Sequence, residues 1–292
     1  SEGWPVLLEK MQFPEPVISV SIEPKTISEQ DKLKDILAVL AKEDPTFTTR
    51  DNEETGQLII SGMGELHLDV LVTRILKEFN LSAKLGKPQV TYRESISKAA
   101  EHSEDFSRVV AGKENAAGIT LRVEPAERGS GNRYACAVHG KNDVPDAIFA
   151  AVERGITGAF GSGIVMGYPC IDIIATVTGI RYSELTGTDF AFEACASMAF
   201  DEACRAAAPV LLEPIMAVDL SSPHEFVGEV LSLVTQRGGQ VMSMNAKADI
   251  DEIEARAPMA QMFGFMTSLR SVSQGRAGFS MEFSHFEKQT GR

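Results

Sequence analysis

Residues 57–85 read QLIISGMGELHLDVLVTRILKEFNLSAKL, and this stretch decides the fold. Its first five residues form a short apolar run typical of a strand, and a Gly-Met-Gly turn follows. From residue 65 to residue 79 apolar side chains recur at helical spacing and predict an amphipathic helix. Residues 81–85 predict a second strand. The stretch therefore has the order strand, helix, strand.

The residues before this stretch predict a further strand, helix and strand. Residues 17–22 alternate apolar and polar side chains, as a half-buried strand does. Ser28 is suited to cap the helix that follows, and Pro45 ends it before the strand 47–50. The apolar face of that helix is formed by Leu33, Ile36, Leu37 and Leu40. Together the two halves predict the β-α-β-β-α-β order of a ferredoxin-like domain.

The last third of the chain repeats that order. Residues 214–220 predict a strand, and Pro223 opens a helix that ends at Gly238-Gly239, a C-cap signal. The remaining elements are strands over 240–245 and 250–256, a helix from Pro258 that carries Met259, Met262, Phe263 and Met266, and a strand over 277–286. The sequence therefore predicts a second ferredoxin-like unit.

The segment between the two repeats has a different pattern. It opens with a strand over 89–96 and contains helical stretches over 145–160 and 190–207. The strongly apolar run 170–177 predicts a central strand of its sheet. Two long polar connections, 139–145 and 179–188, are candidates for binding because long structured loops often carry function. The fold class predicted for the whole chain is α+β with three domains.

Composition excludes several classes of function. The chain has 292 residues and a net charge of −13, and each of its three parts is acidic, so no basic arm favours broad binding of nucleic acid. One Trp and four Tyr argue against base-stacking platforms. No apolar run is long enough for a membrane span. Any contact with RNA must therefore come from a few placed side chains.

The cysteines predict neither a metal site nor a disulfide framework. Cys136, Cys170, Cys195 and Cys204 show no CxxC spacing and have no paired His ligands. We expect them to be buried thiols in a reducing cytoplasm.

Several long motifs resemble one known family. Residues 13–24 read FPEPVISVSIEP, residues 53–69 read EETGQLIISGMGELHLD, and residues 259–283 read MAQMFGFMTSLRSVSQGRAGFSMEF. The stretches GKPQVTYRE at 86–94 and PVLLEPIM at 209–216 fall at two domain junctions. In this order the motifs resemble the C-terminal, ribosome-engaging part of bacterial elongation factor G.

The resemblance implies a domain order. Residues 1–12 would be a linker from upstream domains, 13–88 the ferredoxin-like domain III, 89–210 the ribosomal protein S5 domain 2-like domain IV, and 211–292 the ferredoxin-like domain V. The P-loop of a GTPase, GxxxxGK[ST], and the NKxD and DxxG motifs do not occur in the sequence. We therefore expect no catalytic residue, no cofactor site and no GTP hydrolysis in this chain. GTP and Mg²⁺ would bind a GTPase domain outside it.

The resemblance also implies a function and partners. The function is GTP-dependent translocation of tRNA and mRNA, with this chain as a binding lever. The partners are the ribosome (16S and 23S rRNA and ribosomal proteins), the tRNA–mRNA complex, and the GTPase domain of the same protein. A monomer in the cytoplasm without membrane contact is expected.

Three groups of site residues are carried over from the family. The domain IV tip loops would contact tRNA and the ribosome through Lys141, Asn142, Asp143, Arg181, Tyr182, Ser183 and Glu184. Domain V would contact 23S rRNA through Arg270, Gln274 and Arg276. The GTPase-domain interface would comprise Gly62, Met63, Gly64, Glu65 and His67.

Two stretches also have an enzymatic interpretation. The glycines of 155–167 resemble a phosphate loop, as in small-molecule kinases that share the domain IV fold. No Lys or Ser/Thr follows in register, so a helix exit with a tight turn is favoured. Glu65 and His67 resemble a catalytic pair, but no third group is evident, so an interface role is favoured.

The predicted tip departs from the family pattern. Ser183 stands where the family has a tip His, and residues 112–118, GKENAAG, replace the family's GRGQYG. Asp143 and Glu184 would weaken contact with RNA phosphate, whereas Lys141 and Arg181 would favour it. Two interpretations stay open. One is a translocase that has drifted in sequence, and the other is a paralogue specialised for ribosome recycling or for translocation with altered GTP dependence.

Overall fold

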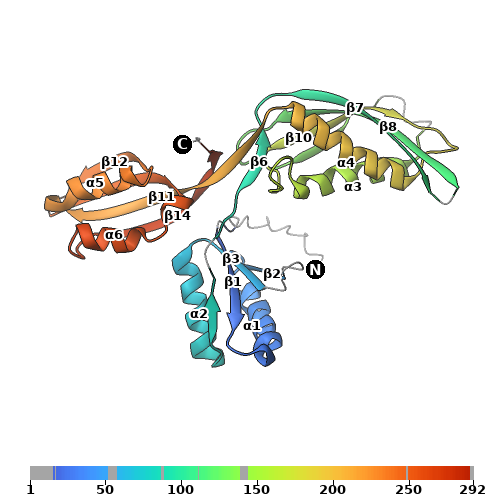
Figure 1. Ribbon diagram of the computed structural model, residues 1–292. Coiled ribbons are helices and arrows are strands. Elements are labelled where there is room, and N and C mark those ends of the chain that lie inside the picture. The colour runs from blue at the N-terminus through green and yellow to red at the C-terminus, as the bar shows by residue number, and fades with distance from the viewer. Residues whose placement is uncertain are drawn as a thin grey trace, which may run out of the picture. The chain divides into compact units, whose positions relative to one another are not determined.

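The computed structural model describes residues 16, 18–51, 58–86, 89–110, 112–138, 144–247 and 249–289. These residues form three β-sheets, each with its own pair of α-helices (Figure 1). By contacts, the described residues divide into two compact units, one drawn from 1–91 and 214–284 and the other from 92–213 and 285–292. The predicted α+β class is confirmed.

The N-terminal sheet has the strand order β2-β3-β1-β4, and β5 pairs with the start of β1. Its elements are β1 (Ile18–Pro24), α1 (Gln30–Glu43), β2 (Thr48–Asp51), β3 (Leu58–Gly62), α2 (Glu65–Phe79), β4 (Ala83–Leu85) and β5 (Gln89–Val90). This is the predicted β-α-β-β-α-β order. The buried face of α1 is the predicted one, with Leu33, Ile36, Leu37 and Leu40.

Ser28 does not cap α1, so that prediction was wrong. A 3-10 turn over Ile27–Glu29 comes first, and α1 begins at Gln30 without a side-chain cap. The Ser28 hydroxyl donates to Thr26 Oγ1 at 3.3 Å instead. The extra turn moves the helix start away from Ser28, so its side chain cannot reach the free amides of the first helical turn.

The middle sheet has the order β7-β8-β10-β9, with β10 in its interior as predicted. Helices α3 and α4 cover one face of it (Figure 1). The elements are β6 (Arg93–Ile96), β7 (Ala100–Val110), β8 (Lys113–Pro125), β9 (Arg133–Cys136), α3 (Asp146–Ser162), β10 (Ile173–Arg181) and α4 (Asp189–Ala206). Strand β6 pairs with the first residues of β11 (Pro209–Pro223), which leads into the C-terminal sheet.

Helices α3 and α4 pack closely because small residues line their contact. A Cβ atom on Gly155 would lie 2.4 Å from the main-chain oxygen of Glu193 in α4, so only glycine fits there. The sequence interpretation had placed the glycines of 155–167 at a helix exit. The helix predicted over 145–160 already included Gly155 and Gly158; α3 continues through Gly161 to Ser162, and the exit lies at Gly163, whose φ is +78°.

The C-terminal sheet has the order β12-β13-β11-β14. Its remaining elements are α5 (Val227–Gln236), β12 (Gln240–Ala246), β13 (Ile250–Pro258), α6 (Phe265–Val272) and β14 (Gly278–Lys288). Gly238 adopts a φ of +71° after α5, which agrees with the predicted C-cap. The helix predicted from Pro258 is wrong at its start, because a 3-10 turn over Met259–Gln261 and the left-handed Gly264 delay α6 until Phe265.

None of the helices in the described part of the chain is long and apolar enough to cross a membrane.

Candidate functional site

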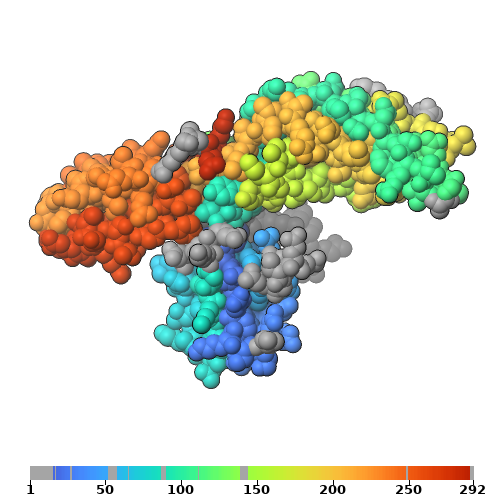
Figure 2. Space-filling view, in the orientation of Figure 1, coloured from blue at the N-terminus to red at the C-terminus, as the bar shows by residue number. Residues whose placement is uncertain are grey.

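The second predicted tip loop lies against the β7–β8 hairpin. It follows β10, and the amide of Ala116 in β8 donates to the carbonyl of Thr186 at 2.9 Å. The Thr188 hydroxyl donates to Asn115 Oδ1, also at 2.9 Å, and accepts from the Ala191 amide as the N-cap of α4. Figure 2 shows the two segments, green and yellow, at one end of the middle domain. We call this end, residues 105–110, 112–118 and 181–188, the tip end.

The four predicted residues of this loop have different environments. Ser183 and Glu184 are exposed, and the Ser183 carbonyl accepts from the amides of Thr186 and Gly187 in a tight turn. Tyr182 is half-buried, with its ring 6.1 Å from that of Phe192, so it supports the loop from inside. The other predicted tip residues, Lys141, Asn142 and Asp143, lie outside the described residues.

The guanidinium of Arg181 is already paired within the chain. Its Nε donates to Asp105 Oδ1 at 3.2 Å, Nη2 forms a second and shorter contact with the same oxygen, and Nη2 also reaches the Glu104 carbonyl at 3.4 Å. The sequence suggested Arg181 as a cation that favours phosphate. The structure gives this cation an acidic partner from a strand far away in the sequence.

Sequence reasoning missed part of the tip end. Arg108 and Lys113 lie at the end of the β7–β8 hairpin, and among the described residues neither makes an ion pair. Val109 and Leu185 are large apolar side chains that are exposed, Leu185 by 93 %. The two cations flanking a hairpin turn were a signal in the sequence, but their place beside the segment 181–188 depends on strand register.

The opposite end of the middle domain holds a buried carboxylate. Glu94 in β6 is 2 % exposed, and its two oxygens accept four backbone N–H bonds of 2.7–3.2 Å. The donors belong to the loop after α3 and are Ile164, Val165, Met166 and Tyr168. We call this end, Glu94 with residues 162–171 and 201–206, the base end.

Glu94 decides against the phosphate-loop interpretation. Successive backbone amides turned toward one point form an anion-binding nest. Here the chain's own carboxylate already occupies that nest, so a phosphate would have to displace it.

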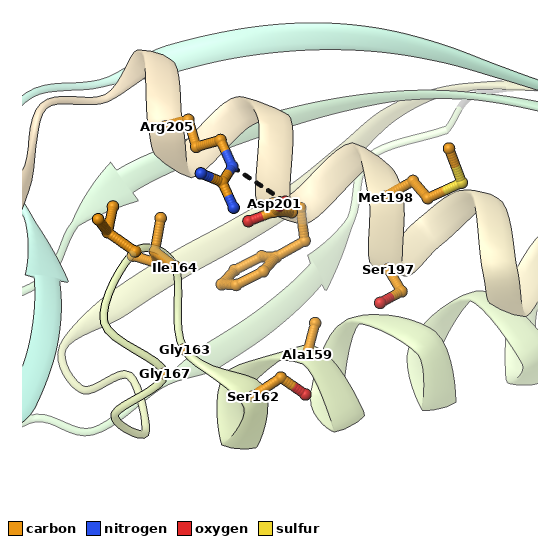
Figure 3. Close-up of a pocket in the computed structure, with 11 residues that line it drawn as sticks. Ala159, Ser162, Gly163, Ile164, Gly167, Ser197, Met198, Asp201 and Arg205 are labelled. Carbon is orange, nitrogen blue, oxygen red and sulfur yellow. Dashed lines mark hydrogen bonds and ion pairs between the residues drawn. The ribbon is translucent and has the colours of Figure 1, made fainter.

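A groove of about 430 Å³ lies beside this loop, between the C-terminal parts of α3 and α4 (Figure 3). It is lined by Ser162, Gly163, Ser197, Asp201 and Arg205, among others. Arg205 Nε donates to Asp201 at 3.0 Å, which neutralises the cation in the groove. The described residues that line the groove therefore offer no unpaired cation to a phosphate.

The predicted GTPase-domain interface is organised by His67. The Met63 amide donates to His67 Nδ1 at 3.1 Å, so Nδ1 carries no proton, and Nε2 donates to Asp44 Oδ2 at 2.9 Å. Asp44 is a third group that sequence reasoning did not find, because it comes from the end of α1. Since both ring nitrogens are engaged, His67 has none left for a substrate. The structural role of His67 is favoured, and the Glu65 side chain lies outside the described residues.

Asp44 is held in its ionised form. Burial acts to raise the pKa of this carboxyl, but the hydroxyl and amide of Thr46 and the His67 ring hydrogen-bond to it and outweigh burial. Its pKa therefore lies below the ordinary value. The turn Gly62-Met63-Gly64 is thereby tied to the end of α1.

The predicted rRNA-contacting residues of the C-terminal domain differ in availability. Arg270 and Gln274 are exposed, and Gln274 adopts a left-handed φ of +52° where the chain turns after α6. Arg276 forms an ion pair with Glu225, and its guanidinium lies 4.6 Å from the centre of the Phe226 ring. A contact from Arg276 to phosphate would therefore exchange one anionic partner for another.

The cysteines are free thiols. Cys170, Cys195 and Cys204 are buried and Cys136 is half-buried, so the prediction of buried thiols holds fully for three of the four. Burial raises the pKa of Cys170 to about 12 and that of Cys195 to about 11. In the described part of the chain, no group of three or more His, Cys, Asp or Glu is placed to hold a metal ion.

In chain order, a ferredoxin-like domain, an S5 domain 2-like domain and a second ferredoxin-like domain define the class of protein, the C-terminal part of a translation elongation factor. Comparison with protein families agrees. The model for Elongation Factor G, domain III matches residues 13–87, that for Elongation factor G, domain IV matches 88–208, and that for Elongation factor G C-terminus matches 210–292. The chain belongs to the elongation factor G family.

Individual relatives are similar over nearly the whole chain. Elongation factor G 1 of Treponema denticola is 58 % identical over 98 % of the chain, and Elongation factor G 2 of Treponema pallidum is 52 % identical over 97 %. The chain spans only 43 % and 42 % of the length of these relatives. A crystal structure of a protein from Thermus thermophilus aligns with a TM-score of 0.72 and 31 % identity, over 96 % of this chain and 42 % of that one.

Proposed function

We propose that this chain is the ribosome-engaging part of a translational GTPase that moves tRNA and mRNA through the ribosome. The observation that carries the proposal is the match to three consecutive elongation factor G domains in their family order. In this proposal GTP and Mg²⁺ bind a GTPase domain of the same protein, and the chain described here supplies no catalytic group.

Each domain has its own part in the proposed mechanism. The N-terminal domain contacts the GTPase domain through the turn that His67 and Asp44 hold in place. The C-terminal domain contacts 23S rRNA through exposed side chains such as Arg270. The tip end of the middle domain enters the decoding site behind the moving tRNA. Movement of tRNA and mRNA is favoured because the ribosome accommodates the tip end better after translocation than before it. Binding of the tip end therefore shifts the population toward the translocated state.

The acidity of the chain limits how it can bind RNA. A net charge of −13 opposes non-specific binding, which depends on neutralising phosphates. At the tip end Arg108 and Lys113, which make no ion pair among the described residues, lie on the hairpin that contacts the segment 181–188. We include these two cations in the proposed RNA-contacting surface. Contacts are then few and depend on shape, as expected for recognition of folded RNA.

A paralogue with another role on the ribosome is the second candidate. The observations in its favour are Ser183 where the family has a tip His and the segment 112–118 where the family has GRGQYG. Identity to the relatives does not decide the matter, because it is similar for a protein named Elongation factor G 1 and one named Elongation factor G 2. Such a paralogue would split ribosomes for recycling, or would translocate with altered dependence on GTP.

A toeprint on pre-translocation ribosomes tests the proposal. The full-length parent protein is added with GTP, and the position of the mRNA is read by primer extension. A shift by one codon is expected of a translocase. Absence of a shift, with GTP hydrolysis still stimulated by ribosomes, would contradict it and favour the paralogue. Subunit splitting in the presence of recycling factor is then the decisive second assay.

A further inference from the structure

Arg181, Gly118 and Asp105 form a row across the outer face of the middle sheet. Arg181 in β10 is in register with Gly118 in β8, and Gly118 is in register with Asp105 in β7. The Arg181 side chain therefore passes over β8 to reach the Asp105 carboxylate in β7. Directly paired residues two strands apart do not ordinarily touch, since neighbouring strands are separated by about 4.8 Å.

Gly118 makes this crossing possible. A Cβ atom at this position would lie 2.6 Å from Arg181 Nε and 2.8 Å from Asp105 Oδ1. Any side chain here would occupy the path of the guanidinium. The neighbouring acidic side chain, Glu104, does not compete for Arg181, because its carboxylate pairs with His102 at 2.9 Å. The strand register therefore brings Arg181 and Asp105 together, and the missing side chain at Gly118 lets them pair.

The pair lies beside a cavity. A depression of about 350 Å³ is lined by Asp105, Gly118, Arg181, Ser183 and Thr186, among others. It has room for a phosphate group, and its lining combines Arg181 with the hydroxyl-bearing residues Ser107, Ser183 and Thr186. The side chains of Arg181 and Asp105 are 53 % and 77 % exposed, so water and salt screen the pair and another anion can replace Asp105.

We propose that this depression is a site for an RNA phosphate, and that Asp105 and Gly118 are specificity residues that keep Arg181 masked until such a phosphate is presented to it. The inference rests on the proposed function, in which the tip end meets RNA. On a chain of net charge −13, masking suppresses binding to RNA outside the ribosome. A phosphate held by the ribosome in the right place replaces Asp105 as the partner of Arg181.

Binding of a fluorescein-labelled oligouridine to the full chain, followed by anisotropy, tests the proposal. Asp105→Asn removes the competing charge, and Gly118→Ala blocks the crossing without any change of net charge. Both variants should bind roughly two- to fivefold more tightly than the wild type, given the typical strength of an exposed ion pair. The slope of log K against log salt should steepen by about 0.7, as expected for one additional phosphate contact on a single strand.

Two controls separate unmasking from a general change of charge. Glu127→Gln changes the net charge by the same amount as Asp105→Asn, at an exposed carboxylate of the middle domain that makes no ion pair among the described residues. It should leave oligouridine binding near the wild-type value. Arg181→Gln combined with Asp105→Asn should abolish the gain, because the gain requires the freed guanidinium.

The outcomes distinguish this proposal from the proposed function. Equal binding by Asp105→Asn and Glu127→Gln, while the wild type still binds 70S ribosomes, contradicts the masking of Arg181 and leaves the proposed function unaffected. If neither the wild type nor any variant binds RNA or ribosomes, both the masking proposal and the proposed function are contradicted. If thermal unfolding shows that Gly118→Ala does not fold, Asp105→Asn and its double variant decide alone.

Discussion

The base end and the tip end of the middle domain handle their charges in opposite ways. At the base end one carboxylate, Glu94, is buried and bonded by four backbone amides. At the tip end the carboxylate of Asp105 is largely exposed and shares its partner Arg181 with solvent. A buried, fully bonded charge is expensive to disturb, whereas an exposed pair exchanges partners readily. The base end is thus suited to stability, and in the proposed function the tip end is suited to binding.

The largest effect is expected at Glu94. Glu94→Ala leaves four amides without their acceptor and should lower the free energy of unfolding of the middle domain by about 3–5 kcal/mol. Glu94→Gln keeps the shape but presents a donor to donors, so a smaller loss of about 2 kcal/mol is expected. Urea unfolding measures both. A loss below about 0.5 kcal/mol for Glu94→Ala would show that the nest contributes little to stability.

A smaller effect is expected from two glycines of α3 that lie one turn apart. Gly155→Ala pushes a Cβ against the main chain of α4 and should destabilise by about 2–3 kcal/mol. Gly158→Ala meets no atom within 4 Å and should stabilise by about 0.5–1 kcal/mol, through helix propensity alone. Thermal unfolding of the two variants checks the opposite signs. Equal effects would mean that α3 and α4 do not pack as described.

The reactivity of the buried Cys170 thiol is a second probe of the base end. Burial first, and then the nearby charge of Glu94, raises the pKa of Cys170 to about 12. At about pH 8 very little of it is thiolate, the reactive form, so iodoacetamide should modify the half-buried Cys136 well before Cys170. Raising the pH toward 12 increases the thiolate fraction of Cys170. Glu94→Gln should lower the pKa of Cys170 and speed its labelling, as mass spectrometry would show.

The smallest effect on stability is expected at the tip end. Ser183→Ala and Glu184→Gln change exposed side chains whose functional groups are not needed by the fold, so unfolding should move by less than about 0.5 kcal/mol. The same substitutions in the full-length parent should nevertheless alter the rate of the one-codon shift in the toeprint. A large loss of stability would contradict the contrast between the two ends.

The sequence predicted those parts of the fold that depend on local pattern. The buried face of α1 and the bounds of α2 follow from apolar periodicity, which needs no knowledge of the partner elements. The sequence did not explain why residue 155 is a glycine, because the reason, the close approach of Glu193, comes from another helix. The delayed start of α6 depends on the left-handed Gly264, which an apolar helical pattern conceals.

The candidate sites were predictable only in part. The loop with Ser183 could be chosen from its length and from family resemblance, and its residues stay predictions. Its neighbours Arg108 and Lys113 could not be predicted from the sequence, because their position depends on the register between β7 and β8. The partner of Arg181, Asp105, and that of His67, Asp44, were also not predicted, because each lies far from its partner in the sequence.

Photocrosslinking on the ribosome tests the contrast between the two ends most directly. p-Benzoylphenylalanine is placed at Ser183 in the tip end or at Val165 in the base end of the full-length parent, and each variant is bound to ribosomes carrying tRNA and mRNA. Both positions are exposed, so both probes are accessible. The account predicts crosslinks to tRNA, mRNA or 16S rRNA from position 183, and no crosslink to tRNA or mRNA from position 165. The reverse pattern would contradict it.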